Sequence, residues 1–309
     1  MVRIENRNTR LNTAIFFICI IFLFGPSSNL FAQHKDTSNI LLAAAKIKNE
    51  PFYFIKQPNV IFPEILKGNE ANASDYIATF SAKKRNYLVQ IFKKGKNILP
   101  KVNAILKKNN LPKELGILML LESDCNANAL SKAGAVGYWQ IMDVVAKEYG
   151  LHYVPHISSK EKKKIIALDA KKAALFFTAR AKLKDDRKNF NKSTLTAARY
   201  LKESQQYLDD DWLLVVASYN CGLGNVRKAI RKSGKINPGF WEIKKYLPSE
   251  TQAYVMNFIT LSVIAHNYEN FYDKNLNFTP VKILIPGNFE PIQTDNGVIS
   301  ESETFLQQQ

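Results

Sequence analysis

Glycine, proline and acidic residues are all sparse in this 309-residue chain. Its 13 Gly and 12 Pro exclude a collagen-like or low-complexity architecture, and no internal repeat is present. The chain has 27 Asp+Glu against 43 Lys+Arg, a formal net charge of +16. Such a charge favours a polyanionic partner but does not choose among nucleic acid, anionic lipid and an acidic polymer. The hydrophobic fraction of 46% excludes a disordered chain and supports one large domain or two small ones.

Several catalytic and cofactor signatures are also missing. His152 and His156 are four residues apart, but Pro155 between them argues against a helical zinc pair. The segment Gly222–Gly224 begins a predicted helix without the Gly-Lys-Ser/Thr ending of a phosphate-binding loop. No Gly-x-Ser-x-Gly nucleophile elbow is present. The sequence therefore predicts neither a metal nor a cofactor.

The N-terminus has the pattern of a secretory signal peptide. Three Arg precede an apolar run, Ala14–Phe24, which is about half the ~20 residues needed to span a bilayer. A Gly-Pro-Ser-Ser turn follows, and Ala32 stands where cleavage is expected. An uncleaved membrane anchor is the alternative interpretation. Removal of residues 1–32 leaves a net charge of +14, and export to the periplasm or cell envelope makes nucleic acid an improbable partner.

The rest of the chain is predicted to be mainly α. Residues 33–75 lack a sustained period and form a lead-in with one short helix at Ile40–Asn49, whereas helical spacing of apolar residues begins after Asp75. Residues 271–309 form a short extended tail, with Val281–Ile285 as its one readable strand. A new helix is predicted to begin near Pro112, and later helices are predicted at Lys160–Lys184, Thr194–Tyr207, Trp212–Tyr219, Asn225–Lys232 and Pro248–Asn267.

Glu122 is the most informative single residue. It lies near the end of a helix, Leu115–Ser123, that is apolar almost all round, as in a buried core helix. A carboxyl group that loses hydration there acquires a raised pKa, as a general acid near neutral pH requires. The alternative is a structural Glu paired with a Lys or Arg.

Four motifs follow one another along the chain. They are Glu122-Ser123, the stretch Gly134 to Met142, the stretch Ala217 to Gly222, and the stretch Leu247 to Val255. In their order and spacing they resemble the lytic murein transglycosylases of the soluble-transglycosylase type, whose catalytic domain has the goose-type lysozyme fold. Within that group the chain is most similar to the membrane-bound lytic murein transglycosylase D branch, and the resemblance covers about residues 76–270.

The resemblance implies a mechanism with one catalytic carboxyl group. Glu122 would protonate the glycosidic oxygen between N-acetylmuramic acid and N-acetylglucosamine in peptidoglycan, and would then deprotonate the muramyl 6-hydroxyl as it closes onto C1. Ordinary glycosidases need a second carboxylate at about 5 to 9.5 Å. Asp124 is the nearest candidate, but two residues along a helix it points away from Glu122, so a solvated or capping role is favoured.

The resemblance also implies a substrate-binding set and a partner, the peptidoglycan glycan strands. Trp139 and Trp212 are separate, since core packing is favoured for Trp212 and both core and groove remain open for Trp139. The residues that match family positions lining the groove or holding the carboxyl group are Ser123, Gln140, Met142, Tyr219, Asn220, Glu250 and Tyr254.

Departures from the family pattern keep two other functions open. Tyr138 replaces an aliphatic residue, Asp143 replaces a common Pro, and Asp185–Asn189 lacks the last acid of an Asp-x-Arg-x-Asp stretch. None of these changes removes a catalytic group. The alternatives are a muramidase of the same fold that admits water, and an inactive peptidoglycan-binding protein.

Residues 152–184 form an insertion roughly 20 to 25 residues longer than the family pattern. Four Lys between Lys160 and Lys164 precede two apolar clusters, which predicts one basic amphipathic helix. Packing of its apolar face on the domain is favoured. The alternatives are contact with the carboxylates of the peptidoglycan stem peptides and weak contact with a membrane surface.

The two cysteines that remain after cleavage flank the predicted site. Cys125 replaces an aromatic residue of the Glu-Ser-x-aromatic motif, and Cys221 replaces a small residue after Tyr-Asn. Because an exported protein sees oxidising conditions, a disulfide between them is a hypothesis. Two buried free thiols are the alternative.

Overall fold

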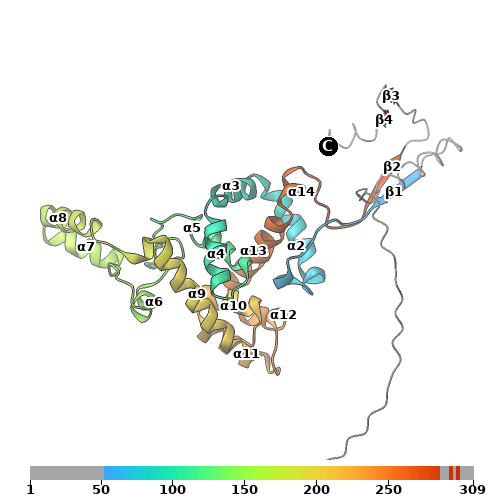
Figure 1. Ribbon diagram of the computed structural model, residues 1–309. Coiled ribbons are helices and arrows are strands. Elements are labelled where there is room, and N and C mark those ends of the chain that lie inside the picture. The colour runs from blue at the N-terminus through green and yellow to red at the C-terminus, as the bar shows by residue number, and fades with distance from the viewer. Residues whose placement is uncertain (1–51, 286–291, 295–296, 300–309) are drawn as a thin grey trace, which may run out of the picture. The chain divides into compact units, whose positions relative to one another are not determined.

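A computed structural model describes residues 52–285, 292–294 and 297–299. The predicted signal peptide and the predicted helix at Ile40–Asn49 therefore lie outside the described residues. The chain divides into two compact units, and the larger of them, residues 55–283, contains every helix of the described part (Figure 1).

Most helices of the described residues follow one another with short connections, and the longest connection is the loop of residues 124–142. Short 3₁₀ helices lie at Glu64–Leu66, Lys113–Gly116, Asp186–Lys188 and Lys244–Tyr246. The α-helices are α2 (Glu70–Lys83), α3 (Arg85–Gly95), α4 (Leu99–Lys108), α5 (Ile117–Ser123), α6 (Asp143–Glu148), α7 (Ser159–Leu168), α8 (Ala170–Ala181), α9 (Phe190–Tyr207), α10 (Trp212–Cys221), α11 (Leu223–Ser233), α12 (Phe240–Ile243), α13 (Ser249–His266) and α14 (Tyr268–Tyr272).

Strands are few in the described residues. Strands β1 (Phe52–Lys56) and β2 (Val281–Ile285) form one two-stranded sheet. Strands β3 (Ile292–Thr294) and β4 (Gly297–Ile299) pair antiparallel, with Ile292 opposite Ile299. The mainly α fold class is confirmed, together with the helical insertion and the extended C-terminal segment.

Two details of the N-terminal lead-in differ from the prediction. Residues 52–56 form a strand, and α2 begins at Glu70 rather than after Asp75. The strand has the sequence Phe-Tyr-Phe-Ile-Lys, and its aromatic and β-branched residues fit a pleated surface. The strand was not predicted because its five residues do not alternate between apolar and polar side chains.

Helix α13 is the centre of the core. It is apolar on nearly all sides and packs against α2, α5 and α10, with Val255, Phe258 and Ile259 fully buried. Helix α5 places its apolar residues Ile117 to Leu120 in the same core. Residues near the end of α5 are thereby held beside the first turns of α13, although about 130 positions separate them in the chain.

The insertion is two helices rather than the single helix that the sequence predicted. Asp169 has an extended backbone with φ of −164° and caps α8 by accepting a hydrogen bond from the backbone N–H of Lys172, so α7 ends there. Much of the expected packing on the domain is not found, since Leu168 is 87% exposed and Leu175 is 72% exposed, although Ala173 is buried. In Figure 1, α7 and α8 lie at the left edge, away from α2, α5 and α13.

A loop of residues 124–142 connects α5 to α6. It folds back on itself through isolated bridges that join Leu130 to Val136 and Val136 to Ile141. Gly137 lies in this loop with φ of +81°, and a Cβ atom there would collide with the carbonyl oxygen of Arg187. Only glycine meets both conditions, so the loop can approach the segment that follows the insertion.

Candidate active site

Glu122 lies one residue before the end of α5 and is half-buried. The hydroxyl group of Tyr254 on α13 donates a hydrogen bond of 2.6 Å to its Oε1 atom. Among the described residues, no Lys or Arg forms an ion pair with Glu122. The structural alternative, a core Glu neutralised by a basic residue, therefore does not hold for this carboxyl group.

The surroundings of Glu122 raise its pKa to about 7. Burial is the largest cause, because it disfavours the charged form. The hydrogen bond from Tyr254 acts in the opposite direction, and the negative charge of Glu250 adds to the increase. Near neutral pH both protonation states are populated, so the group is able to give a proton and to take one back.

Tyr219 on α10 lies on another side of the same carboxyl group. Burial, followed by the negative charge of Glu122, raises its pKa well above the usual value, so it remains a protonated phenol. Its hydroxyl donates a 2.8 Å hydrogen bond to the carbonyl oxygen of Trp139. Trp139 itself is fully buried and donates from Nε1 to Thr194, which assigns it to the core. The ring of Tyr200, which the sequence did not single out, supports Tyr219 at a centroid distance of 5.6 Å.

Ser123 and Gln140 hold the loop of residues 124–142 in place. The Ser123 hydroxyl donates to the carbonyl oxygen of Tyr138 at 2.8 Å. The Gln140 side-chain amide donates to the carbonyl oxygens of Gly137 and Ala129 at 3.0 and 3.3 Å. Gln140 also has φ of +46°, an uncommon conformation for this residue type that the side-chain bonds help to maintain.

The remaining predicted residues occupy the rim. Asn220 accepts a 2.8 Å hydrogen bond from the Thr251 hydroxyl, which ties the end of α10 to the start of α13. Glu250 is exposed on the first turn of α13, and Met142 is 41% exposed where α6 begins. The structure thus brings Glu122 together with Tyr219, Glu250 and Tyr254, while Met142 and Asn220 make no described contact with it.

The hypothesised disulfide is absent, and this is a correction. Cys125 and Cys221 are both free thiols, each half-buried. Their surroundings differ, since Cys125 interacts electrostatically with Asp124 and Lys94, whereas the Cys221 thiol donates a 3.8 Å hydrogen bond to the carbonyl oxygen of Gly222. Burial raises both pKa values, that of Cys125 to about 12, so neither thiol is a reactive thiolate near neutral pH.

Beyond the loop lies an ion cluster centred on Arg187, which is 1% exposed. Asp185 accepts from its Nε and Nη2 atoms at 3.0 and 2.8 Å, and Asp143 accepts from Nη1 at 2.6 Å. The carbonyl oxygens of Ile141 and Val154 accept the two remaining N–H groups, so all five guanidinium donors are used. In the sequence, Asp143 stands out only as a replacement for Pro. The structure shows that an acid at this position accepts a hydrogen bond from Arg187.

Asp143 also accepts a 2.6 Å hydrogen bond from the backbone N–H of His156. Burial acts most strongly on Asp185, yet the bonds from Arg187 and from the backbone N–H of Val154 outweigh it and lower the Asp185 pKa. The cluster fastens the start of α6 to both ends of the insertion. It therefore fixes the loop that carries Gln140.

Two wider searches cover only the described part of the chain. No group of three or more His, Cys, Asp or Glu in residues 52–285 is arranged to hold a metal ion. No helix within that range is long and apolar enough to cross a bilayer.

Comparison with known proteins finds a family model that matches the part of the chain containing this site. The model of the transglycosylase SLT domain matches residues 102–238. The membrane-bound lytic murein transglycosylase D of Escherichia coli strain K12 is 29% identical over 189 residues, which are 60% of this chain and 35% of that protein. A putative tributyltin chloride resistance protein of Alteromonas sp. strain M-1 is 29% identical over 140 residues, 45% of this chain and 55% of that protein.

A solved structure is also similar. It is an inactive mutant of the lytic transglycosylase Slt from Pseudomonas aeruginosa, with 19% identity, a TM-score of 0.37, and coverage of 55% of this chain and 24% of that one. The chain spans about a third of the length of the Escherichia coli relative. The family match includes Glu122, Gln140 and Tyr219, and of these Tyr219 interacts electrostatically with the half-buried carboxyl group of Glu122. Over residues 102–238 the chain is therefore similar to the transglycosylase SLT domain.

Proposed function

We propose that this protein is an exported peptidoglycan lytic transglycosylase of the cell envelope, active in cell-wall remodelling. The observation that carries the proposal is Glu122, which has no cationic partner among the described residues and whose pKa is raised to about 7 within the stretch that matches the SLT domain. The name of the Escherichia coli relative, a lytic murein transglycosylase, supports the same activity. We further propose that residues 76–270 form the catalytic domain and that residues 1–32 are a signal peptide.

The reaction begins with Glu122 protonated. Its proton passes to the oxygen of the β-1,4 bond between N-acetylmuramic acid and N-acetylglucosamine, and the bond from that oxygen to the muramyl C1 breaks. The carboxylate then accepts the proton of the muramyl 6-hydroxyl while O6 bonds to C1. A 1,6-anhydro ring results, Glu122 regains its proton, and no water is consumed.

The residues around Glu122 orient its carboxyl group and contact the sugars. Tyr254 donates a hydrogen bond to the carboxyl group and so holds its orientation through both proton transfers. Tyr219 remains a neutral hydroxyl beside it. We assign the sugar contacts to the groove-lining residues that the resemblance implied, which are Ser123, Gln140, Met142, Asn220 and Glu250.

Localisation follows from charge and from the insertion. The net charge of the chain is +16, and peptidoglycan carries many carboxylates, so long-range attraction retains the protein at the wall. The exposed Lys and apolar residues of α7 and α8 add weak contact with a membrane surface.

Mass spectrometry of digested peptidoglycan tests the activity. Purified peptidoglycan is incubated with the mature protein, with the Glu122→Gln variant and with the Glu250→Gln variant, and the soluble products are weighed. We expect 1,6-anhydro muropeptides from the wild type and from Glu250→Gln, and none from Glu122→Gln.

Two results would refute the proposal in different ways. Reducing ends one water heavier, lost in Glu250→Gln, would make the protein a muramidase in which Glu250 activates water. Unchanged release of anhydro products by Glu122→Gln would remove Glu122 from the chemistry. An absence of any product from the wild type would favour an inactive peptidoglycan-binding protein.

A further inference from the structure

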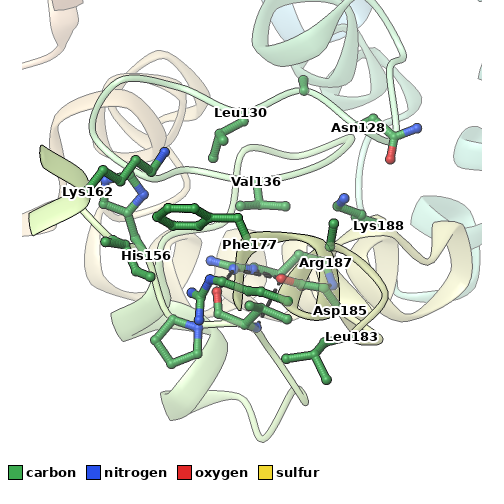
Figure 2. A pocket seen from close by; sticks show the side chains of 16 residues that line it. Asn128, Leu130, Val136, His156, Lys162, Phe177, Leu183, Asp185, Arg187 and Lys188 are labelled. Atoms are coloured by element: carbon green, nitrogen blue, oxygen red, sulfur yellow. Dashed lines mark hydrogen bonds and ion pairs between the residues drawn. The ribbon is translucent and has the colours of Figure 1, made fainter. Parts of the chain in front are cut away.

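A cavity of about 320 Å³ lies between the loop of residues 124–142 and the inserted helices. Figure 2 shows Leu130 and Val136 of the loop above the ring of Phe177 from α8, with Lys162 and His156 to its left. None of the predicted active-site residues lines this cavity. Because α7 and α8 supply one of its walls, the cavity exists only through the insertion.

The charges in this cavity are of two kinds. At its base, Arg187 and Asp185 neutralise each other and use their hydrogen-bonding capacity on the cluster described above. Around it, Lys162, Arg180 and Lys188 also line the cavity and have no carboxylate partner among the described residues. The uncompensated charge of the cavity is therefore positive.

The walls between these cations are largely apolar. Leu130, Phe177 and Leu183 contribute hydrocarbon surface, and Leu130 and Leu183 are 59% and 57% exposed. Exposed side chains of this size in a concave site favour a ligand that is part alkyl, whereas free cations favour carboxylates.

The cavity shares a structural element with the proposed glycan groove. The carbonyl oxygen of Ala129 accepts hydrogen bonds from the Gln140 side chain and from the Gly137 backbone, and Ala129 itself lines the cavity. The same loop begins immediately after Glu122 and Ser123. One loop therefore joins the predicted active site to the wall of the cavity.

From this arrangement we propose that the cavity binds the stem peptide of the glycan strand, an acidic peptide with short alkyl side chains. This inference rests on the proposed function, since it assigns a further contact to the same substrate. Arg180 and Lys188 hold peptide carboxylates, and Leu130, Phe177 and Leu183 contact the alkyl groups. The insertion thereby makes cleavage depend on the peptide as well as on the glycan.

Two variants test the cavity in different ways. Arg180→Gln/Lys188→Gln removes the cations, and Ala181→Trp fills the space from α8 without a change of charge. Lys228→Gln/Arg231→Gln on α11 is the matched control, because it removes one Lys and one Arg that are exposed outside the cavity.

The measured quantity is kcat/KM on intact glycan strands and on strands stripped of stem peptides by an amidase. We expect both cavity variants to lose about tenfold on intact strands, which corresponds to about 1.4 kcal/mol, and less than twofold on stripped strands. The control should change both substrates equally. Equal losses on both substrates by the cavity variants, or no loss at all, would overturn the proposal.

A binding measurement separates this proposal from the proposed function. A purified disaccharide tetrapeptide and the same disaccharide without peptide are titrated into the full mature protein in the Glu122→Gln background. We expect the peptide to strengthen binding about tenfold, and Arg180→Gln/Lys188→Gln to abolish that gain. If no substrate is cleaved but this difference is measured, the activity fails while the cavity assignment stands.

Sedimentation with phosphatidylglycerol vesicles covers the competing use of the same cations. We expect Arg180→Gln/Lys188→Gln and Lys228→Gln/Arg231→Gln to bind the vesicles equally. A selective loss of vesicle binding by Arg180→Gln/Lys188→Gln, with peptide discrimination intact, would assign these cations to lipid and overturn the proposal.

Discussion

Two carboxyl groups withdrawn from water in this protein respond to burial in opposite ways. Glu122 receives one hydrogen bond from a neutral phenol and has no cationic partner in the described structure, so burial raises its pKa to about 7. Asp185 is more deeply buried, yet the guanidinium of Arg187 holds its pKa below the usual value. Burial alone therefore does not raise the pKa of a carboxyl group. The pKa rises where, as at Glu122, no neighbouring cation of the described structure compensates the negative charge of the buried group.

The largest expected effect is on the reaction itself. Glu122→Gln removes the group that we propose carries the proton in both directions, so kcat should fall about 10³-fold or more. Asp124→Asn is the matched control, because Asp124 lies two residues away with φ of +50°, which Asn tolerates, and forms only an exposed ion pair with Lys94. Its kcat should stay within about twofold, measured by release of anhydro muropeptides. A comparable loss in both variants would end the distinction between these carboxyl groups.

The next effect concerns the stability of the ion cluster. Arg187→Leu leaves Asp185 and Asp143 without their cation, so the free energy of unfolding should fall by about 3 to 5 kcal/mol. Urea unfolding followed by circular dichroism measures it. Arg180→Gln, which removes an unpaired cation nearby, should change the same quantity by less than about 0.5 kcal/mol. Equal changes in the free energy of unfolding for the two variants would show that the ion cluster does not stabilise the fold more than an unpaired surface cation does.

The third expected effect is a gain of stability in the same Glu122→Gln variant that should lose activity. The folded-state pKa of Glu122 is raised from 4.5 to about 7, so its ionisation destabilises the fold as pH rises through that interval. Below pH 4.5 Glu122→Gln and wild type should be equally stable. Above pH 7 the variant should be more stable by at most about 3 kcal/mol. Urea unfolding at pH 4, 6 and 8 measures the difference, and a variant that is less stable at pH 8 would contradict the assigned environment.

The contribution of Asp185 to stability depends on pH in the opposite direction. Because its folded-state pKa is lowered, the stability that it contributes is present above its usual value of 3.8 and is lost as pH falls through the lowered pKa. Acid should therefore weaken the cluster while leaving Glu122 in its preferred protonated form.

The smallest expected effect is a shift of the pH profile. Tyr254→Phe removes the hydrogen bond that lowers the Glu122 pKa, so the basic limb of kcat/KM should move up by about one unit. Glu250→Gln removes a charge that raises the same pKa, so its limb should move down by a smaller amount. Shifts in the same direction for both variants would show that the limb does not report Glu122.

The sequence was most informative where one helix carried the signal. Glu122 stood out because the helix before it is apolar all round, a property visible within ten residues. Its hydrogen bond to Tyr254 joins residues 132 positions apart, and only the resemblance linked them in advance. The pairing of Asp143 with Arg187, 44 positions apart, was invisible for the same reason.

The insertion shows which local signals were overlooked. The box formed by Ser158 and Glu161 and the cap at Asp169 are both N-terminal helix signals, and together they divide the segment into two helices. The hypothesised disulfide failed differently, since it rested on two motifs converging on one groove. Convergence of backbones leaves the direction of each side chain undetermined, and the two thiols have different neighbours.

By itself the sequence determined a mainly α chain with a basic charge and a carboxyl group on an apolar helix. These follow from composition and from short-range periodicity, which each segment carries on its own. Tertiary structure decided that Glu122 lacks a cation while Asp185 has one, and that the insertion encloses a cationic cavity. The reason is electrostatic, because a pKa and a binding site depend on distances between side chains that only the folded chain sets.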